Sequence, residues 1–294
     1  MESAEGALPF VVLACGSFRP EDVQVSVEPT ARPTTPELER LIAEEWDRQT
    51  ILASRAGRLL FDGRLLRYVR HEVAPAADGA ERLHLTVGPT CYRDFVGTNL
   101  FNHHRLGEIA WESFANPIGT TATLITGDGC LCYGRRSQRV AYHGGHVHTF
   151  GGALEEQDLA ADGRSVGAYA SLLRELREEL NLDRGDLAEA WCVGLIRDKE
   201  IWQPELLFDV RTELSVAELS ERWSSAEAKD EHVELVTCRN EPTAIVPFLL
   251  ACGAIAPVGI GAIFLHGRRL WGEAWFERGA GQLAAAMGWM SGGA

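Results

Sequence analysis

The sequence is poor in basic residues. Its 294 residues include 28 lysines and arginines against 42 aspartates and glutamates, which gives a formal charge of -14. A surface with this excess of negative charge repels a phosphate backbone, so the composition argues against extended nucleic acid as a partner. A small phosphorylated ligand remains compatible with it, because a divalent cation and a few arginines can bridge the like charges.

Cysteine is also sparse. The seven cysteines are odd in number and thinly spread, unlike the dense disulfide framework of a small secreted domain. The apolar run at residues 7–15 lacks the positive flank of a signal peptide, because no lysine or arginine precedes Arg19. These two features predict a cytoplasmic protein with reduced thiols.

Long uncharged runs are limited to one, at residues 244–265. It has the length of a membrane span, but Pro247, Pro257 and three glycines interrupt it. We therefore interpret it as a buried helix, a turn and a buried strand at residues 261–265, and a membrane helix is the less favoured alternative.

What is present is the composition of a globular protein. Hydrophobic residues make up 46% and charged residues 24%, with 30 glycines and only 12 prolines, which excludes disorder as the main state. The length fits two domains or one large domain. We place a boundary near Asn116-Pro117, because the pattern of predicted elements changes there.

The elements on the two sides of this boundary predict different lobes. Residues 1–116 carry a strand at 10–15, a helix at 36–46 and paired strands at 58–66 and 81–87, which predict a small β-rich lobe. Residues 117–294 predict a mixed sheet with helices. Its elements are strands at 121–126, 130–134, 190–195 and 205–211, a long helix at 165–180 and a closing helix at 284–289.

The helix at 165–180 carries the most informative pattern. Leucines and Tyr169 recur at helical spacing and form one apolar stripe. Glu175, Glu178 and Glu179 lie at positions i, i+3 and i+4, on one side of the helix and bordering that stripe. Like charges at this spacing repel each other. A divalent cation that accepts several carboxylate oxygens explains the cluster, and a solvated acidic face is the alternative.

The surrounding residues resemble the Nudix box, G-x5-E-x7-R-E-U-x-E-E-x-G-U, in which U is a bulky aliphatic residue. The run from Arg174 to Leu182 reads R-E-L-R-E-E-L-N-L, and it follows Phe150-Gly151-Gly152. Asn181 replaces the final glycine, a mild change because asparagine tolerates the left-handed conformation that often ends a helix.

The first half of the box departs further from the pattern. Gly152 lies 22 residues before Arg174 where the pattern has 14, which indicates an insertion around residues 158–163. Val166 stands at the position of the first glutamate, and Glu155 or Glu156 is a candidate to replace that glutamate in space.

A second segment narrows the resemblance. Residues 92–99 read Y-R-D-F-V-G-T-N and are similar to a segment of the UDP-glucose pyrophosphatase branch of Nudix proteins. Further landmarks extend the match from about residue 45 to about residue 265: Leu60-Phe61-Asp62, Asn116-Pro117-Ile118-Gly119, Arg135-Arg136-Ser137 and Gly261-Ala262-Ile263.

This resemblance implies an α/β protein, a Nudix α/β/α sandwich with a mixed sheet preceded by a smaller β-rich N-terminal lobe. It also implies hydrolysis of UDP-glucose or UDP-galactose to UMP and sugar 1-phosphate, with Mg2+ or Mn2+ as cofactor. The predicted partner is a small nucleotide sugar, with neither a nucleic acid nor a membrane.

The resemblance also implies roles for individual residues. Glu175 and Glu179 match the metal ligands, Glu178 completes the acidic set, and Arg174 orients Glu175. The positions that match substrate-contacting residues are Phe61, Tyr92, Arg136, Ala141, His148 and Glu155. His148 stands where a family member carries an acidic residue, which puts the sugar or base preference in question.

Elementary chemistry gives these residue types a function. Arg136 suits a phosphate because its guanidinium donates two parallel hydrogen bonds, and a basic hairpin edge is the alternative. Tyr92 and Phe61 suit stacking on a uracil ring, with plain core packing as the alternative. Glu178, Glu205 and Glu231 are the candidates to accept a proton from the attacking water.

Three other functions compete with this hypothesis. Three histidines and two cysteines suggest zinc, although their spacing fits zinc motifs poorly. These residues are His143, His146, His148, Cys130 and Cys132. A Nudix-fold sensor that binds a nucleotide sugar without turnover is favoured by the altered box and disfavoured by the retained glutamates. A hydrolase of ADP-ribose or another nucleoside diphosphate derivative is the third. A serine nucleophile is unsupported, because no G-x-S-x-G motif occurs.

Overall fold

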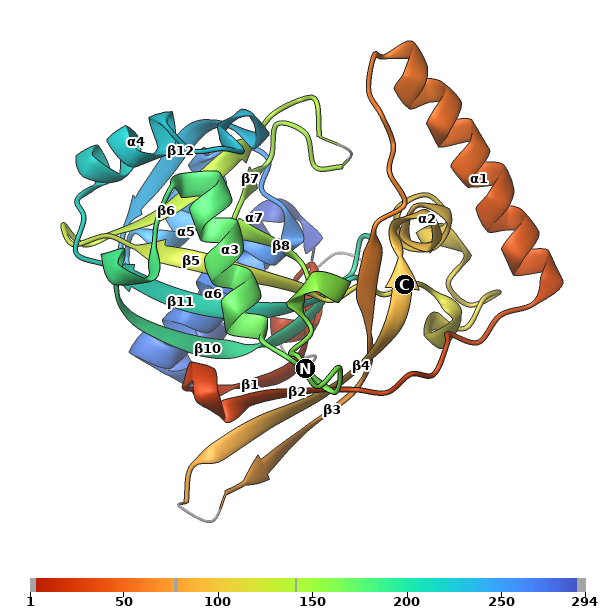
Figure 1. Ribbon diagram of the computed structural model, residues 1–294. Coiled ribbons are helices and arrows are strands. Elements are labelled where there is room, and N and C mark those ends of the chain that lie inside the picture. The colour runs from red at the N-terminus through yellow and green to blue at the C-terminus, as the bar shows by residue number, and fades with distance from the viewer. Residues whose placement is uncertain (1–3, 77–78, 141, 290–294) are drawn as a thin grey trace.

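The computed structural model describes residues 4–76, 79–140 and 142–289, which form two β-sheets flanked by helices (Figure 1). The helices are α1 (Pro36–Arg55), α2 (Tyr92–Phe95), α3 (Ala168–Leu180), α4 (Val216–Ser224), α5 (Ile245–Ala251), α6 (Pro257–Trp271) and α7 (Glu273–Met287). The strands are β1 (Phe10–Phe18), β2 (Val23–Val27), β3 (Arg64–Pro75), β4 (Glu81–Cys91), β5 (Gly119–Ile125), β6 (Cys130–Arg136), β7 (Val147–His148), β8 (Phe150–Ala153), β9 (Ser165–Val166), β10 (Leu187–Asp198), β11 (Pro204–Thr212) and β12 (His232–Arg239).

The larger sheet is mixed, as predicted. Its strands follow the order β1-β10-β11-β5-β6-β12, with β8 paired to β5 and β7 paired to β6. Strands β11 and β5 run parallel, and β5 pairs antiparallel with both β6 and β8. Because β6 runs opposite to β5 and β11, its last residue lies at the sheet end where β5 and β11 begin.

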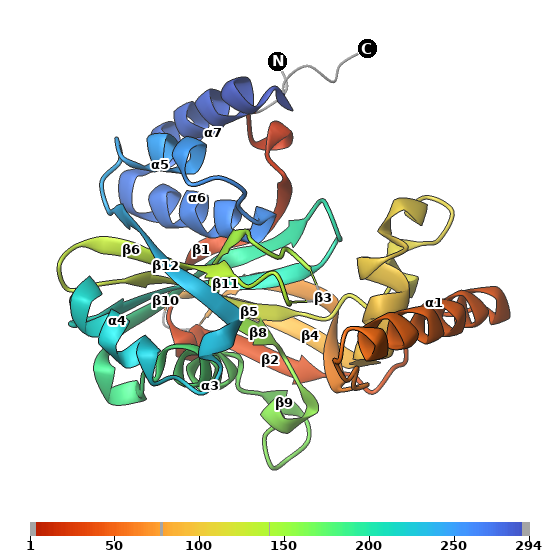
Figure 2. The same cartoon turned by 90° about the horizontal axis from the view of Figure 1, so that it is seen from above.

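Helices cover both faces of this sheet (Figure 2). Helices α3 and α4 lie on one face, and α5, α6 and α7 lie on the other. The predicted α/β/α arrangement is therefore confirmed. Each face of the sheet buries its own hydrophobic cluster, one against α3 and one against α6 and its neighbours.

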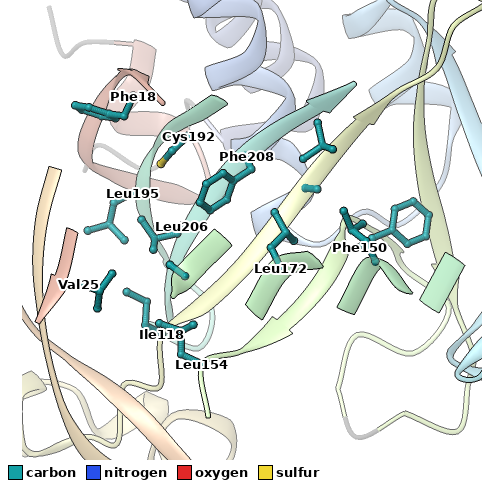
Figure 3. Close-up of a cluster of buried hydrophobic side chains, with 14 of the residues drawn as sticks. Phe18, Val25, Ile118, Phe150, Leu154, Leu172, Cys192, Leu195, Leu206 and Phe208 are labelled. Atoms are coloured by element: carbon teal, nitrogen blue, oxygen red, sulfur yellow. The ribbon is translucent and has the colours of Figure 1, made fainter. Parts of the chain in front are cut away.

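The cluster on the α3 face also takes in the smaller sheet (Figure 3). Leu172 of α3 packs with Phe208 and Leu206 of β11, and Val25 of β2 belongs to the same buried group. Helix α3 is amphipathic, so its apolar stripe enters this cluster and its glutamates border it.

The smaller sheet has the order β3-β4-β2-β9. Strand β9 directly follows the segment inserted in the box, and its Val166 pairs with Val25 of β2. In turn, β1 comes from the N-terminal segment but pairs with β10 in the larger sheet. Each side of the predicted boundary thus contributes one strand to the sheet of the other side. A domain boundary near Asn116 stays a prediction.

The predicted N-terminal helix and strand are both present, but their bounds differ from the prediction. Thr35 caps α1 by accepting a hydrogen bond from the Leu38 N–H at 3.2 Å, and the helix continues beyond the predicted residue 46 to Arg55. The predicted strand at 58–66 begins only at Arg64, where β3 starts to pair with β4.

The predicted strand at residues 261–265 is wrong, because these residues lie within α6. Pro257 occupies the first turn, where its fixed backbone favours a helix start. Gly261 lets α6 approach β10 closely, since a Cβ there would lie 2.5 Å from Cδ1 of Ile196. A helix buried on nearly all sides has no polar face, so its sequence does not distinguish it from a buried strand.

The start of the predicted helix at 165–180 also needs correction, because Ser165 and Val166 form β9 and α3 begins at Ala168. The end of the helix is confirmed. Asn181 adopts the left-handed conformation, with φ 55° and ψ 40°, at the C-cap of α3. The closing helix, α7, runs from Glu273 to Met287 rather than over 284–289.

Two predictions about the whole chain have a structural counterpart. The seven cysteines are free thiols. Within the described ranges, no helix combines the length and the apolar character that a membrane crossing requires.

Candidate active site

Helix α3 covers its three clustered glutamates to different degrees. The side chain of Glu179 is buried at 3% exposed, that of Glu175 is partly buried at 15%, and that of Glu178 is 38% exposed. Glu175 and Glu179 lie four residues apart, so their carboxylates share one side of the helix. The two residues that the resemblance implies as metal ligands are thus the less exposed pair, and Glu178 lies at the edge.

Both carboxylate oxygens of Glu179 are contacted. The Gly151 N–H of β8 donates to Oε2 at 2.9 Å, and Nε2 of His232 lies 3.5 Å from Oε1. Burial raises the pKa of Glu179 well above its usual range, and the nearby charge of Glu231 raises it further. Burial lowers the pKa of His232 to about 4, so a neutral imidazole, rather than a cation, faces Glu179.

Glu175 lies beside a glycine that leaves room for it. Nη1 of Arg174 donates to Oε1 of Glu175 at 2.7 Å, the contact through which Arg174 is predicted to orient this carboxylate. Burial nevertheless raises the pKa of Glu175 to about 8. A Cβ on Gly152 would lie 2.6 Å from the carboxyl carbon of Glu175, so only glycine at this position permits the observed place of the carboxylate.

Gly152→Ala is therefore expected to displace the Glu175 carboxylate and lower catalytic turnover by about 10- to 100-fold, the range typical of losing a group that orients a metal ligand. The end of a glutamate side chain moves easily, so the melting temperature should stay nearly unchanged. Steady-state kinetics and thermal denaturation of the variant measure both effects. Gly185→Ala is the matched control, because its Cβ meets no atom within 4 Å. Equal activity of the two variants would contradict the role of Glu175 as a metal ligand.

Arg174 has an acidic partner that the sequence analysis did not identify. Its Nη2 lies 3.4 Å from Oδ2 of Asp158, an oxygen that also accepts a hydrogen bond from Ser171 Oγ at 2.9 Å. Neither Glu155 nor Glu156, the candidates to replace the missing first glutamate, makes this contact in the described structure. Asp158, in the inserted segment, is the acidic residue that faces Arg174.

The donor chemistry of α3 fits a divalent cation of the magnesium type. Glu175 and Glu179 offer carboxylate oxygens, which such ions prefer, and burial disfavours the charge that a cation would neutralise. In the described ranges, no three histidine, cysteine, aspartate or glutamate side chains already converge as a metal site. The metal ligands accordingly stay a prediction.

Arg136 occupies the sheet end next to this pair. It is the last residue of β6, and its guanidinium carbon lies 5.4 Å from the centre of the Tyr142 ring. Burial raises the pKa of Glu179, Glu205 and Tyr92, which come from three different elements, and the positive charge of Arg136 opposes part of each rise. Its Nε is buried and has no hydrogen-bond partner among the described residues. An anion is the ligand that such a group accepts.

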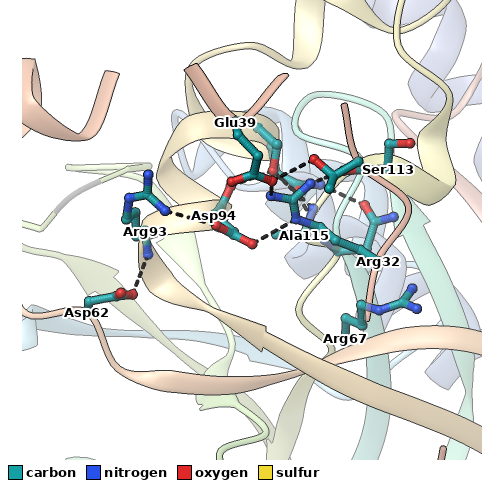
Figure 4. Close-up of polar contacts among 12 residues, drawn as sticks. Arg32, Glu39, Asp62, Arg67, Arg93, Asp94, Ser113 and Ala115 are labelled. Carbon is teal, nitrogen blue, oxygen red and sulfur yellow. Dashed lines mark hydrogen bonds and ion pairs between the residues drawn. The ribbon is translucent and has the colours of Figure 1, made fainter. Parts of the chain in front are cut away.

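The two aromatic residues implied in nucleotide binding, Phe61 and Tyr92, each precede a residue of one hydrogen-bonded pair. Asp62 accepts a hydrogen bond from the Arg93 N–H at 2.8 Å, which joins the segment after Phe61 to the segment after Tyr92 (Figure 4). Asp94 in turn accepts from Nε of Arg32 at 2.7 Å. Phe61 is 76% exposed, so the core-packing alternative for this residue is wrong.

The remaining residues that the resemblance implies in substrate binding are His148, Glu155 and Ala141. His148 is buried, its Nδ1 lies 2.8 Å from the Thr149 carbonyl oxygen, and burial lowers its pKa well below the usual range. Glu155 accepts a hydrogen bond from Gln157, and Ala141 lies outside the described residues. The zinc alternative gains no support, because the histidines and cysteines form no metal-binding group in the part of the chain that the structure describes.

Some of these neighbours left no signal in the sequence. His232 lies 53 positions after Glu179 and reaches it only because β12 pairs with β6. Asp158 is one of several acidic residues in a polar loop, and only its contact with Arg174 distinguishes it. Both contacts depend on tertiary structure rather than on spacing along the chain.

Several known proteins are similar to this chain. The chain is 29% identical over 211 residues to uridine diphosphate glucose pyrophosphatase NUDT22 of Homo sapiens, a match that covers 64% of this chain and 68% of the human protein. It is 24% identical over 235 residues to Nudix hydrolase 9 of Arabidopsis thaliana, with 69% and 72% covered. A solved MutT protein from Methanosarcina mazei Go1 is 18% identical with a TM-score of 0.32, covering 55% of this chain and 91% of its own. No profile of a known protein family matches the chain.

The likeness to both curated relatives, together with a Nudix-like box on α3 beside a glycine-rich strand, supports a Nudix-type pyrophosphohydrolase. Among such enzymes the chain resembles the uridine diphosphate glucose pyrophosphatases of human and mouse.

Proposed function

We propose that this protein hydrolyses the pyrophosphate bond of UDP-glucose or UDP-galactose, with Mg2+ or Mn2+, to UMP and sugar 1-phosphate. The observation that carries the proposal is the pair Glu175 and Glu179 beside Arg136, whose strand partner His232 contacts Glu179. A chain of ring contacts connects Arg136 to Tyr92. Carboxylates for a cation, an arginine for phosphate and an aromatic ring for a base are the groups that a nucleoside diphosphate sugar requires.

The residues divide the work of the reaction. Glu175 and Glu179 would hold the cation, Arg174 orients Glu175, and Arg136 binds the phosphate oxygens on which charge develops. When bound, magnesium supplies positive charge to the pyrophosphate and acidifies a water ligand. Glu178 and Glu231 both lie close enough to raise the pKa of Glu179, so they are the nearest groups to accept the proton of the attacking water.

A mass-spectrometric screen tests this function. UDP-glucose, UDP-galactose and ADP-ribose are each incubated with the protein, in magnesium and in a chelator. We expect UMP and sugar 1-phosphate from the UDP-sugars in magnesium only. Preferred cleavage of ADP-ribose would move the substrate to another nucleoside diphosphate derivative. Tight binding of UDP-glucose without any product would instead identify a nucleotide-sugar sensor and overturn the proposal.

A further inference from the structure

Glu205 is a further buried acidic residue at the end of the larger sheet where β5 and β11 begin, and no described residue forms a hydrogen bond or ion pair with it. Glu205, near the start of β11, is 8% exposed, and its carboxylate makes no hydrogen bond or ion pair with any described residue. The carboxylate lies directly over Gly119 of β5, where a Cβ would come within 1.8 Å of Oε2. The fold therefore leaves space for this carboxylate without a described protein partner, so solvent or a ligand is left to satisfy its oxygens.

Glu205 faces away from the α3 glutamates. Leu206 belongs to the cluster packed against α3, whereas Leu207 belongs to the cluster packed against α6. Because side chains alternate along a strand, Glu205 shares the face of Leu207. It is thus on the opposite side of the sheet from Glu175 and Glu179, a position unsuited to accepting a proton from water at those residues.

Arg136 connects the two sides. Arg136 ends β6 where β5 and β11 begin, and its strand partner His232 contacts Glu179. Burial raises the pKa of both Glu179 and Glu205, and the charge of Arg136 opposes part of each rise. A phosphate held by Arg136 would therefore have the predicted cation site on one side and Glu205 on the other. The other ionisable groups around Glu205 are Asp198 of β10 and the Tyr142 hydroxyl. Asp198 is itself engaged, because its Oδ1 accepts the N–H groups of Glu200 and Ile201.

We propose that Glu205 binds adjacent hydroxyl groups of a sugar ring in the substrate. A carboxyl group offers two oxygens side by side, which match a pair of neighbouring hydroxyls. In a nucleoside diphosphate sugar, such rings flank the pyrophosphate on both sides, so a ring next to Arg136 meets Glu205. This inference rests on the proposed function, because it takes the pyrophosphate to lie at Arg136.

Calorimetric binding in a chelator tests the inference without relying on turnover. The variant is Glu205→Leu, which keeps the bulk over Gly119 and removes the polar group. The ligands are UDP-glucose and UDP. We expect the Kd for UDP-glucose to rise about 10- to 100-fold, the effect of losing hydrogen bonds to a buried acid. Glu189→Leu, on the exposed part of β10, is the matched control and should bind as the wild type does.

The two ligands identify which ring is bound. A weakened Kd for UDP-glucose alone places the hexose at Glu205, and a weakened Kd for both ligands places the ribose there. Ligand analogues give the same answer with the wild type. If Glu205 binds the hexose, a UDP-sugar that lacks one hexose hydroxyl should bind more weakly than UDP-glucose. If Glu205 binds the ribose, 2′-deoxy-UDP should bind more weakly than UDP. Glu205→Gln, which retains hydrogen bonding, should bind within about 3-fold of the wild type and keeps the test valid if the leucine variant unfolds.

Two results would overturn the inference. Unchanged binding of both UDP-glucose and UDP by a folded Glu205→Leu protein would make the residue a mere filler of the space over Gly119. Unchanged binding with lost turnover would assign it to the chemical step instead. Failure of the wild type to hydrolyse any nucleoside diphosphate sugar would refute the proposed function, and the binding comparison would still decide the role of Glu205.

Discussion

Replacing Glu179 with glutamine is expected to lower the turnover of UDP-glucose by about 1,000-fold, the factor that corresponds to several kcal/mol of charge stabilisation by a bound metal. Glutamine has nearly the same shape as glutamate, and its amide oxygen can still accept the Gly151 N–H. It lacks the negative charge that holds a cation. The expected loss is therefore of magnesium binding and catalysis, measured by steady-state kinetics and by calorimetric titration with Mg2+.

The fold of this variant should remain intact. Burial already disfavours the ionised form of Glu179 by raising its pKa, so a neutral side chain costs no stability at neutral pH. Glu221→Gln on the exposed side of α4 is the control for loss of one surface charge. Full activity of Glu179→Gln, with a melting temperature like that of the wild type, would refute the assignment of Glu179 as a metal ligand.

The metal-free protein is expected to lose stability as the pH rises from 6.5 to 8. Burial raises the pKa of Glu175 and Glu205 to about 8 and that of Asp198 to about 7. An acid whose pKa is raised by folding keeps its proton longer in the folded state, so it favours folding below its unfolded pKa and loses that contribution as the pH rises through the folded value. The two glutamates alone give a slope of about 3 kcal/mol per pH unit.

Below pH 6.5 the trend is opposed by three buried histidines. Burial lowers the pKa of His143 and His232 to about 4 and that of His148 well below its usual range. These rings stay neutral in the folded state while the unfolded chain takes up protons, so their contribution falls as the pH falls below 6.5. Unfolding free energy in a chelator should accordingly fall less steeply with pH below 6.5 than between pH 6.5 and 8.

Magnesium should restore the stability that the metal-free protein loses between pH 6.5 and 8. A cation binds the ionised carboxylates, which are more abundant at pH 8 than at pH 6.5, so the metal-induced rise in melting temperature should be larger at pH 8. Denaturant titrations at both pH values, with and without magnesium, measure the effect. In Glu205→Gln the decline between pH 6.5 and 8 should be shallower. A metal-free stability that stays level or increases over this range would contradict the burial of these acids.

The sequence predicted the parts of the site that local patterns encode. The spacing of Glu175 and Glu179 placed both on one side of a helix, and Asn181 at its end adopts the expected left-handed conformation. Strands β5 and β6, which precede the glycine-rich segment, also lie close to their predicted positions. These features depend on neighbours within about one turn or one strand, which a sequence displays directly.

The parts that were missed depend on long-range packing. His232 meets Glu179 through strand pairing, and Glu205 lies over Gly119 because β11 and β5 run parallel in that register. Helix α6 was mistaken for a strand because contact with the sheet on one side and α7 on the other leaves it almost without polar residues. In each case the decisive neighbour comes from a distant segment, and no local pattern reveals it.

The lengthened box ties two properties of this protein together. The inserted segment supplies Asp158, which contacts Arg174, and leads directly into β9, which adds an edge strand to the smaller sheet. A deletion of residues 158–163 would remove the acid and shorten the connection to this strand at once. The contacts of helix α3 and the edge of the N-terminal sheet therefore depend on one stretch of chain, and a change there affects both.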